Sequence, residues 1–289
     1  PEGHYDDFKT WDLGDIVGIE GRLFKTKTNE LTVHAESIRL LTKSLRPLPE
    51  KHAGLVDMEQ RYRKRYLDLL TNEASLNVFK IRSKVISEIR NFFGGENYIE
   101  VETPMMHSVL GGAVAKPFIT HHNSLDMDLY LRIAPELYLK RLVVGGMEKV
   151  FEINRNFRNE GLSTRHNPEF TMLEYYTAYA DFEDQMDFIE NLFKSISQIV
   201  LGSTILSLSG KEYDIGKPFR RVTLISSIAT KLGLSESELK EKGKLETIAN
   251  DLSIERCKDL SIGKLQLEIF ERVVEDNLDE PTFITSYPA

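Results

Sequence analysis

The chain has 289 residues, enough for one large domain and a smaller one, and its 41% hydrophobic and 28% charged residues are typical of a folded globular protein. The net charge of -8 argues against a general nucleic-acid binder, although a local basic patch such as residues 61–66 (RYRKRY) can still bind RNA. No apolar run approaches the length of a membrane span, and the single cysteine, Cys257, excludes an internal disulfide framework and a cysteine-rich metal site. We therefore expect a cytoplasmic protein with no membrane partner.

The first part of the chain has the pattern of a small β domain. Residues 15–23 alternate polar and apolar side chains, residues 27–30 (KTNE) suit a hairpin turn, and residues 31–41 resume a strand pattern. Residues 45–49 (LRPLP) predict a linker, because proline resists both helices and central strands. A charged helix is predicted next, over residues 59–70.

The rest of the chain predicts helices and strands in alternation. Apolar residues at helical spacing predict helices over residues 73–93, 135–144 and 182–201, and a mostly helical region at about 223–278. Period-two patterns bounded by turn residues predict strands over residues 98–104, 127–133, 150–157, 205–215 and 281–287, with a hairpin over residues 150–176.

The tip of that hairpin carries the strongest functional signal. Arg158 lies at the mouth of a charged Asn/Gly/Pro loop, and the period of a strand places Phe170, Glu174 and Tyr176 on one face of the returning strand. A cation, an aromatic ring and a carboxylate on a rigid hairpin suit a phosphate, a base and a cationic substrate. The alternative is a surface hairpin with solvated charges.

The outgoing strand has the same division into two faces. Its polar face carries Glu152, Asn154, Asn156 and Arg158. Its apolar face carries Phe151, Ile153 and Phe157. One side of the hairpin therefore packs into a core, and the other is the expected floor of a binding site.

Two segments resemble sequence motifs of the class II aminoacyl-tRNA synthetases. Residues 157–160 (FRNE), followed by His166, Phe170 and Glu174, are similar to motif 2, and residues 97–104 (NYIEVETP) are similar to motif 1. The glycine expected before the aromatic residue of motif 1 is Asn97 here, and asparagine tolerates the left-handed backbone that such a turn needs.

Further segments narrow the resemblance to the bacterial-type lysyl-tRNA synthetases. Residues 111–120 (GGAVAKPFIT), 132–138 (RIAPELY) and 158–176 agree with that family in order and spacing. The resemblance implies an α/β (α+β) fold, with an antiparallel sheet flanked by helices after a β-barrel.

The resemblance also implies a division into domains. Residues 1–45 would be part of an OB-fold anticodon-binding domain, and residues 46–72 would be a linker and junction helix. Residues 73–289 would be the catalytic domain, with motif 3 expected beyond residue 289.

Arg158 is the catalytic residue that the resemblance implies, holding the ATP α-phosphate and the lysine carboxylate. Glu160 and Asn167 would read the adenine and its surroundings, Phe170 would stack on the base, and His166 would lie near the terminal phosphates. Asn159 completes the implied ATP-binding set. ATP is a substrate, and the acidic residues that would hold Mg²⁺ are expected beyond residue 289.

The lysine pocket implied by the resemblance joins two segments. Gly112 and Glu136 would bind the α-amino group, and Glu174 and Tyr176 would line the pocket for the ε-ammonium. A desolvated ammonium needs carboxylate and hydroxyl partners, so the residue types suit this role. The alternative for Glu136 is a residue that only favours the dipole of its helix.

The implied function is lysine–tRNA ligation: ATP-dependent activation of L-lysine and its transfer to tRNA(Lys), by a homodimer joined through the motif 1 region at residues 78–104. One alternative is a non-catalytic tRNA-binding or regulatory module, and another is a lysine ligase acting on elongation factor P. An aspartate or asparagine synthetase would need a basic pocket in place of Glu136 and Glu174.

Because motif 3 is absent from these 289 residues, we expect the chain alone not to form lysyl-adenylate at a useful rate. Lysine-dependent ATP–pyrophosphate exchange measures this directly. Appreciable exchange by the 289-residue chain would contradict the expectation.

Overall fold

A computed structural model describes residues 5–46, 48, 55–163, 166–208, 210–255 and 257–288, so Pro47 and Pro49 of the predicted linker lie outside the described residues. The chain divides into two compact units, Pro1–Ser83 and Lys84–Ala289, and each is described by itself. Within the described ranges, no helix combines the length and apolar character needed to cross a membrane.

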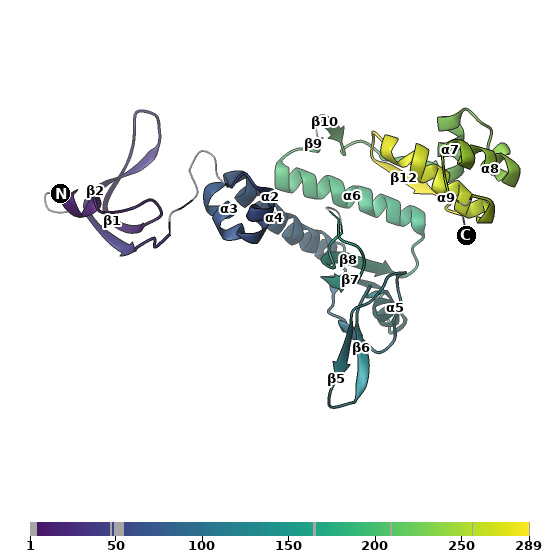
Figure 1. Cartoon of the computed structure of the whole chain (residues 1–289), viewed down its shortest axis with the longest axis horizontal. Coiled ribbons are helices and arrows are strands. Elements are labelled where there is room, and N and C mark those ends of the chain that lie inside the picture. Colours follow the sequence, from purple (N-terminus) through teal and green to yellow (C-terminus); the bar gives the residue numbers. More distant parts are fainter. Residues whose placement is uncertain are drawn as a thin grey trace. The chain divides into compact units, whose positions relative to one another are not determined.

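Runs of helices and runs of strands follow one another along the described residues (Figure 1). The helices are α1 (Tyr5–Phe8), α2 (Met58–Arg63), α3 (Arg65–Thr71), α4 (Glu73–Gly95), α5 (Glu136–Val144), α6 (Phe182–Leu201), α7 (Leu224–Leu232), α8 (Lys242–Asp251) and α9 (Ile262–Val273), with 3₁₀ turns η1 (Glu238–Lys240), η2 (Cys257–Asp259) and η3 (Glu275–Asn277). The strands are β1 (Ile16–Lys25), β2 (Leu31–Thr42), β3 (Ile99–Glu100), β4 (Met106–His107), β5 (Ile119–His122), β6 (Met127–Leu131), β7 (Lys149–Phe157), β8 (Glu169–Thr177), β9 (Ile205–Leu208), β10 (Lys211–Asp214), β11 (Arg220–Thr223) and β12 (Thr282–Thr285).

The first unit contains the predicted hairpin. Strands β1 and β2 pair antiparallel, and the turn between them places Asn29 in the left-handed region, with φ of 64°. Asparagine accepts this conformation more readily than most residues, which is why the turn forms there. At the open end of the hairpin, Lys43 Nζ lies 2.9 Å from Asp15 Oδ2, and hydrogen bonds from the backbone and from Lys43 hold the pKa of Asp15 near 2.

The charged helix predicted over residues 59–70 is two helices, because the backbone leaves the helical region at Lys64, with φ of -116° and ψ of 51°. Arg61 from α2 and Arg65 from α3 both donate to the carboxylate of Asp68, which is only 1% exposed. The break between α2 and α3 thus accompanies a buried, doubly paired carboxylate that keeps two arginines of the basic patch turned inward.

The second unit is built on a three-stranded sheet with the order β3–β7–β8. Strand β3 runs parallel to β7, and β7 pairs antiparallel with β8 over the whole hairpin, from Lys149 opposite Thr177 to Phe157 opposite Glu169. Within the motif 1 segment only β3 is a strand, and directly after β3 the backbone N of Val101 donates to Phe151 O at 2.9 Å. The antiparallel sheet and mixed α/β class expected from the sequence are therefore confirmed.

Helices α4 and α6 cover the apolar face of this sheet (Figure 1). Phe93 is fully buried and stacks on Phe151 with a centroid distance of 4.7 Å. The other members of this aromatic and aliphatic cluster are Tyr98, Leu192, Ile89, Phe92, Ile153, Leu173, Tyr175, Phe188, Ile189 and Ile196. Phe151 and Ile153 of β7 and Leu173 and Tyr175 of β8 thus pack inward, as the period of a strand predicts.

The helix α4 ends at Gly95, two residues after the end predicted at Phe93. The residue that leaves the helix with positive φ is Asn97, at 63°, after which Tyr98 N donates to Phe93 O at 2.9 Å. Asparagine therefore does adopt the left-handed backbone expected at this position of motif 1.

A second sheet, with the order β4–β6–β5, carries the connection between motif 1 and α5. Only β6 was expected from the sequence, because β4 has two residues and β5 is interrupted by polar side chains. Leu131 N donates to Phe118 O and Arg132 N donates to Met105 O, so this sheet fixes the end of β6 directly before α5.

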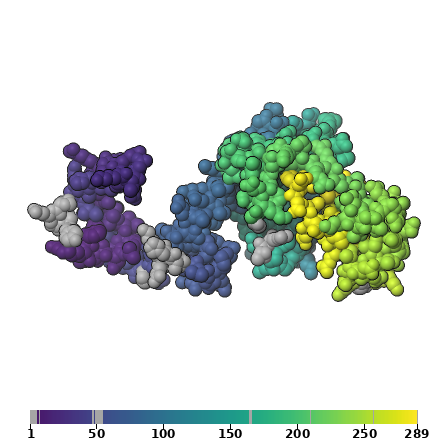
Figure 2. All heavy atoms as spheres, turned by 90° about the horizontal axis from the view of Figure 1, so that it is seen from above, coloured from purple at the N-terminus to yellow at the C-terminus, as the bar shows by residue number. Residues whose placement is uncertain are grey.

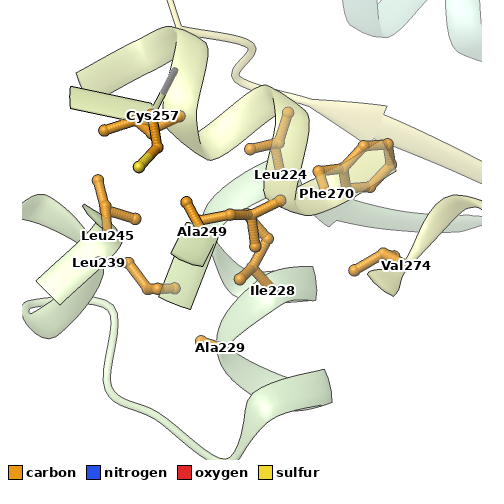
Figure 3. Close-up of a cluster of buried hydrophobic side chains, with 11 residues drawn as sticks. Leu224, Ile228, Ala229, Leu239, Leu245, Ala249, Cys257, Phe270 and Val274 are labelled. Carbon is orange, nitrogen blue, oxygen red and sulfur yellow. The ribbon is translucent and has the colours of Figure 1, made fainter. Parts of the chain in front are cut away.

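The region at about 223–278 is mostly helical, as predicted, and has a core of its own. Side chains from α7, α8, α9 and η1 converge on one another in Figure 3. The buried members are Leu224, Ile228, Ala229, Leu239, Leu245, Ala249, Cys257, Leu265, Ile269, Phe270 and Val274. In the space-filling view, the yellow C-terminal segment lies against green atoms of this region (Figure 2), and Ile284 of β12 packs on the same core.

We expect Phe93→Ala to lower the free energy of unfolding by about 3–5 kcal/mol, because it leaves a cavity among fully buried rings. Urea denaturation of both variants measures the change. Phe193→Ala on α6 is the matched control, since Phe193 is 52% exposed and its loss should cost well under half as much. Equal losses in the two variants would contradict this description of the core.

Candidate active site

The second face of the β7–β8 hairpin is polar and largely closed to water. Glu152 lies opposite Glu174 in the register, and Asn156 lies opposite Phe170. Glu152 and Asn156 are each only 1% exposed. A polar strand face that is buried must have hydrogen-bond partners or a ligand, so it is the part of the molecule where a site is expected.

A buried ion pair forms the base of this face. Arg132 Nη1 lies 2.7 Å from Glu152 Oε1, and both side chains are 1% exposed. Thr103 Oγ1 donates to the other carboxylate oxygen at 2.6 Å, while Arg132 Nε donates to the carbonyl oxygen of Arg155 at 2.8 Å. This network joins the motif 1 segment, the end of β6 and the strand β7, and its members satisfy one another without water.

The predicted lysine-binding residues come together at one end of the hairpin. Tyr176 donates from its hydroxyl to Glu174 Oε1 at 2.8 Å. Burial raises the pKa of the Glu174 carboxyl; the hydrogen bond from Tyr176 opposes this shift, and the nearby charge of Glu136 adds to it. Burial, followed by the bond to Glu174, raises the pKa of Tyr176 as well. Two carboxylates thus lie close enough to destabilise each other in a partly desolvated site, an arrangement that favours a bound cation.

Gly112 lies against the start of α5 from a separate segment of the chain. Its φ is +87°, and a Cβ at this position would lie 2.9 Å from Glu136 Cβ and 3.2 Å from Ala134 Cβ. Only glycine allows both this backbone conformation and this close approach to the first turn of α5. The predicted pair of Gly112 and Glu136 is therefore a real contact.

Glu136 lies in the first turn of α5, after Pro135, where the helix dipole favours a negative charge. Its side chain is 30% exposed and pairs with Lys140, whose Nζ lies 2.6 Å from Glu136 Oε1. Both interpretations of Glu136 drawn from the sequence are thus compatible with its position, because its charge acts on Glu174 and it also favours its helix.

The other end of the hairpin carries the cation and the aromatic ring. The guanidinium carbon of Arg158 lies 5.3 Å from the centroid of the Phe170 ring. Arg158 Nε and Asn156 Oδ1 are buried, and neither has a hydrogen-bond partner among the described residues. Orphaned buried polar atoms cost free energy unless a ligand or water satisfies them, so this end has the character of a binding site.

The loop residues of the predicted ATP set divide into two groups. Asn159 N donates to Lys116 O at 2.7 Å, and Lys116 N donates to Glu160 Oε1 at 3.4 Å, so the hairpin is connected to the segment that carries Gly112. His166 and Asn167 are exposed, and His166 Nδ1 lies 2.8 Å from Ser163 Oγ within the loop. The structure does not bring these two side chains to Arg158.

Across the described ranges, no group of three or more His, Cys, Asp or Glu side chains is arranged to hold a metal ion. The carboxylates of the site do not fit Mg²⁺, because Glu152 is already paired with Arg132 and Glu174 accepts from Tyr176.

Sequence reasoning missed the buried network around Arg132. The segment RIAPELY contains Arg132, but a charged residue beside a strand end is ordinarily exposed, so nothing in the letters indicates burial. The strand period places Glu152 on the polar face, but it does not identify Arg132 as the cation that pairs with this carboxylate. His107 was missed also: it is 3% exposed, its Nε2 donates to Pro104 O at 2.8 Å, and burial lowers its pKa.

The comparison with protein families agrees with this geometry. Residues 57–289 match the model of the tRNA synthetases class II (D, K and N), and the chain belongs to that family. Within it, the chain is similar to the lysine–tRNA ligases of Thioalkalivibrio sulfidiphilus, at 57% identity over 289 residues, and of Photorhabdus laumondii, at 56% over 291. All of the chain is covered in both comparisons, and it spans 58% of the length of each relative.

We expect Arg132→Met to destabilise the second unit by about 3–5 kcal/mol, because Glu152 would remain buried without its partner. The double variant with Glu152→Met should recover most of this loss, since an apolar pair of similar volume needs no compensation. Urea denaturation of the single and double variants measures both effects. A double variant no more stable than Arg132→Met would show that the network does not depend on paired charge.

Proposed function

We propose that the protein containing this chain is a lysine–tRNA ligase, which activates L-lysine with ATP and transfers it to tRNA(Lys). The observation that carries the proposal is the half-buried group of Glu174, Tyr176 and Glu136, with Arg158 and Phe170 on the same hairpin as Glu174. The names of the similar proteins, all lysine–tRNA ligases, point to the same substrate.

The pocket suits the two ammonium groups of lysine. Glu174 and Tyr176 would receive the ε-ammonium, and Glu136 with the backbone at Gly112 would receive the α-ammonium. A site built around buried carboxylates rejects a neutral isostere, because binding it would leave the acidic groups unpaired. It also rejects aspartate, whose side chain would add a third negative charge.

The chemistry requires positioning and charge stabilisation. A carboxylate oxygen of lysine attacks the α-phosphorus of ATP, which forms lysyl-adenylate and releases pyrophosphate. Arg158 would donate to the α-phosphate and to the lysine carboxylate, and its orphaned Nε is available for such a bond. Phe170 would stack on the adenine. Asn159, Glu160, Asn167 and His166 would surround the base and the terminal phosphates, which for His166 and Asn167 requires the loop to move inward.

The carboxylate of lysine is already an anion at neutral pH, so the attack needs no general base. Mg²⁺ would neutralise phosphate charge in such a reaction, and its ligands would come from outside the described residues. We place the reaction in the cytoplasm.

The remaining assignments concern the rest of the protein. Residues 1–45 would be part of the OB-fold anticodon-binding domain, residues 46–72 the linker, and residues 73–289 the catalytic domain. Homodimerisation through residues 78–104 is supported by α4, where Val78, Phe79 and Ile81 are 63%, 45% and 42% exposed.

A thermal-shift titration of the natural full-length protein with lysine, aspartate and ATP tests the proposal. We expect lysine and ATP to raise the melting temperature and aspartate to leave it unchanged, because a ligand that binds only the folded state stabilises it. Glu174→Gln should weaken lysine binding by at least tenfold, since it removes a buried charge that faces the ε-ammonium.

Glu169→Gln is the matched control for this variant. Glu169 lies on the same strand with its side chain 55% exposed, so its loss should leave lysine affinity unchanged. Stabilisation by aspartate and not by lysine would overturn the proposed pocket.

A further inference from the structure

An ammonium group of the chain itself lies at the edge of the proposed lysine pocket. Lys140 is one helical turn after Glu136 on α5, and its Nζ lies 2.6 Å from Glu136 Oε1. The same ammonium lies 5.8 Å from the centroid of the Tyr176 ring. One lysine side chain thus contacts two of the residues that would receive substrate lysine.

This pair differs from the other helical lysine–glutamate pairs in its surroundings. Lys264 and Glu268 on α9 have the same spacing, with a distance of 3.2 Å, but in the described part of the chain no aromatic ring lies under the ammonium of Lys264. The ring under Lys140 belongs to β8, a different element from its own helix. Lys140 is therefore held toward the pocket by a contact that helix formation alone does not require.

The position of Lys140 has an electrostatic consequence for the two carboxylates. Burial is the main cause of the raised pKa of Glu174, and repulsion from the charge of Glu136 adds to it. The ammonium of Lys140 neutralises Glu136 and so offsets part of this repulsion when no ligand is bound. The side chain is 55% exposed, so it can leave Glu136 and enter water at small cost.

A bound amino acid reverses this arrangement. Its α-ammonium would approach the carboxylate that Lys140 already contacts, and two ammonium groups at one carboxylate repel each other. Lys140 must then share Glu136 or move away, and either change reduces the net gain from binding the α-ammonium.

We propose that Lys140 is an internal competitor for the α-ammonium site, which holds Glu136 while the pocket is empty and thereby sets the affinity for lysine. The inference rests on the proposed function, because it takes Glu136 as the partner of the substrate α-ammonium. Lys140 acts as a positioning residue here, through Glu136 and not through the reacting atoms.

The test is the dissociation constant of the natural full-length protein for lysine, measured by calorimetry at low salt. Lys140→Met approximately keeps the length of the side chain and removes the charge. We expect this variant to bind lysine about twofold to fivefold more tightly, which is the change in affinity that corresponds to the free energy of an exposed ion pair. Lys140→Arg should restore the affinity of the unaltered protein. Lys264→Met, which breaks the equivalent pair on α9, should change nothing.

A lysine analogue without the α-amino group separates competition from a general change in the pocket. We expect 6-aminohexanoate, which offers the ε-ammonium and the carboxylate alone, to bind Lys140→Met and the unaltered protein equally. Unchanged or weaker lysine binding by Lys140→Met, or an equal gain for 6-aminohexanoate, would overturn the inference alone. Failure of the unaltered protein to bind lysine would overturn the proposed function and this inference with it.

Discussion

The site depends on the ion pair of Arg132 and Glu152, from which water is excluded. Its cation follows β6, its carboxylate lies on β7, and Thr103 from the motif 1 segment binds both side chains. Three segments that are far apart in the sequence therefore have fixed positions relative to one another. The same strand β7 pairs with β8, so the position of Glu174 opposite Glu152 is fixed as well. A polar network of this kind specifies one arrangement, because any displacement would leave a charge buried and unpaired.

The hairpin was predictable because a strand has a strict period. The alternation of β7 and β8 placed Phe151 and Tyr175 inward and Glu152 and Glu174 on the opposite face, and the structure agrees. The resemblance to the family then assigned Gly112 and Glu136, from a different segment of the chain, to the same site as Glu174. Composition and periodicity could not have done so, because they carry information only about neighbours along the chain.

The features that the sequence did not reveal all depend on tertiary contacts between polar groups. The letters RYRKRY predict a continuous charged helix, whereas a buried Asp68 accompanies a break at Lys64. Lys116 pairs with Asn159 N and with Glu160 Oε1 through its own backbone atoms, which leave no mark on the identity of residue 116. The helical region has a well-defined core around Leu239 and Leu245, yet a core reports packing and not chemistry, so its role does not follow from its fold.

The inward-facing arginines of the first unit also bear on how this chain would meet a polyanion. Proteins that bind nucleic acids displace condensed counterions from the phosphates, and each cation that does so makes binding more sensitive to salt. Arg61 and Arg65 are both committed to Asp68, so they are poor candidates for this exchange. The exposed rings of Tyr62 and Tyr66, at 66% and 64%, remain on the surface. Arg63 and Lys64 are also exposed, so the segment presents two aromatic rings with two of its four cations, and it would release fewer counterions than a patch with all four cations free.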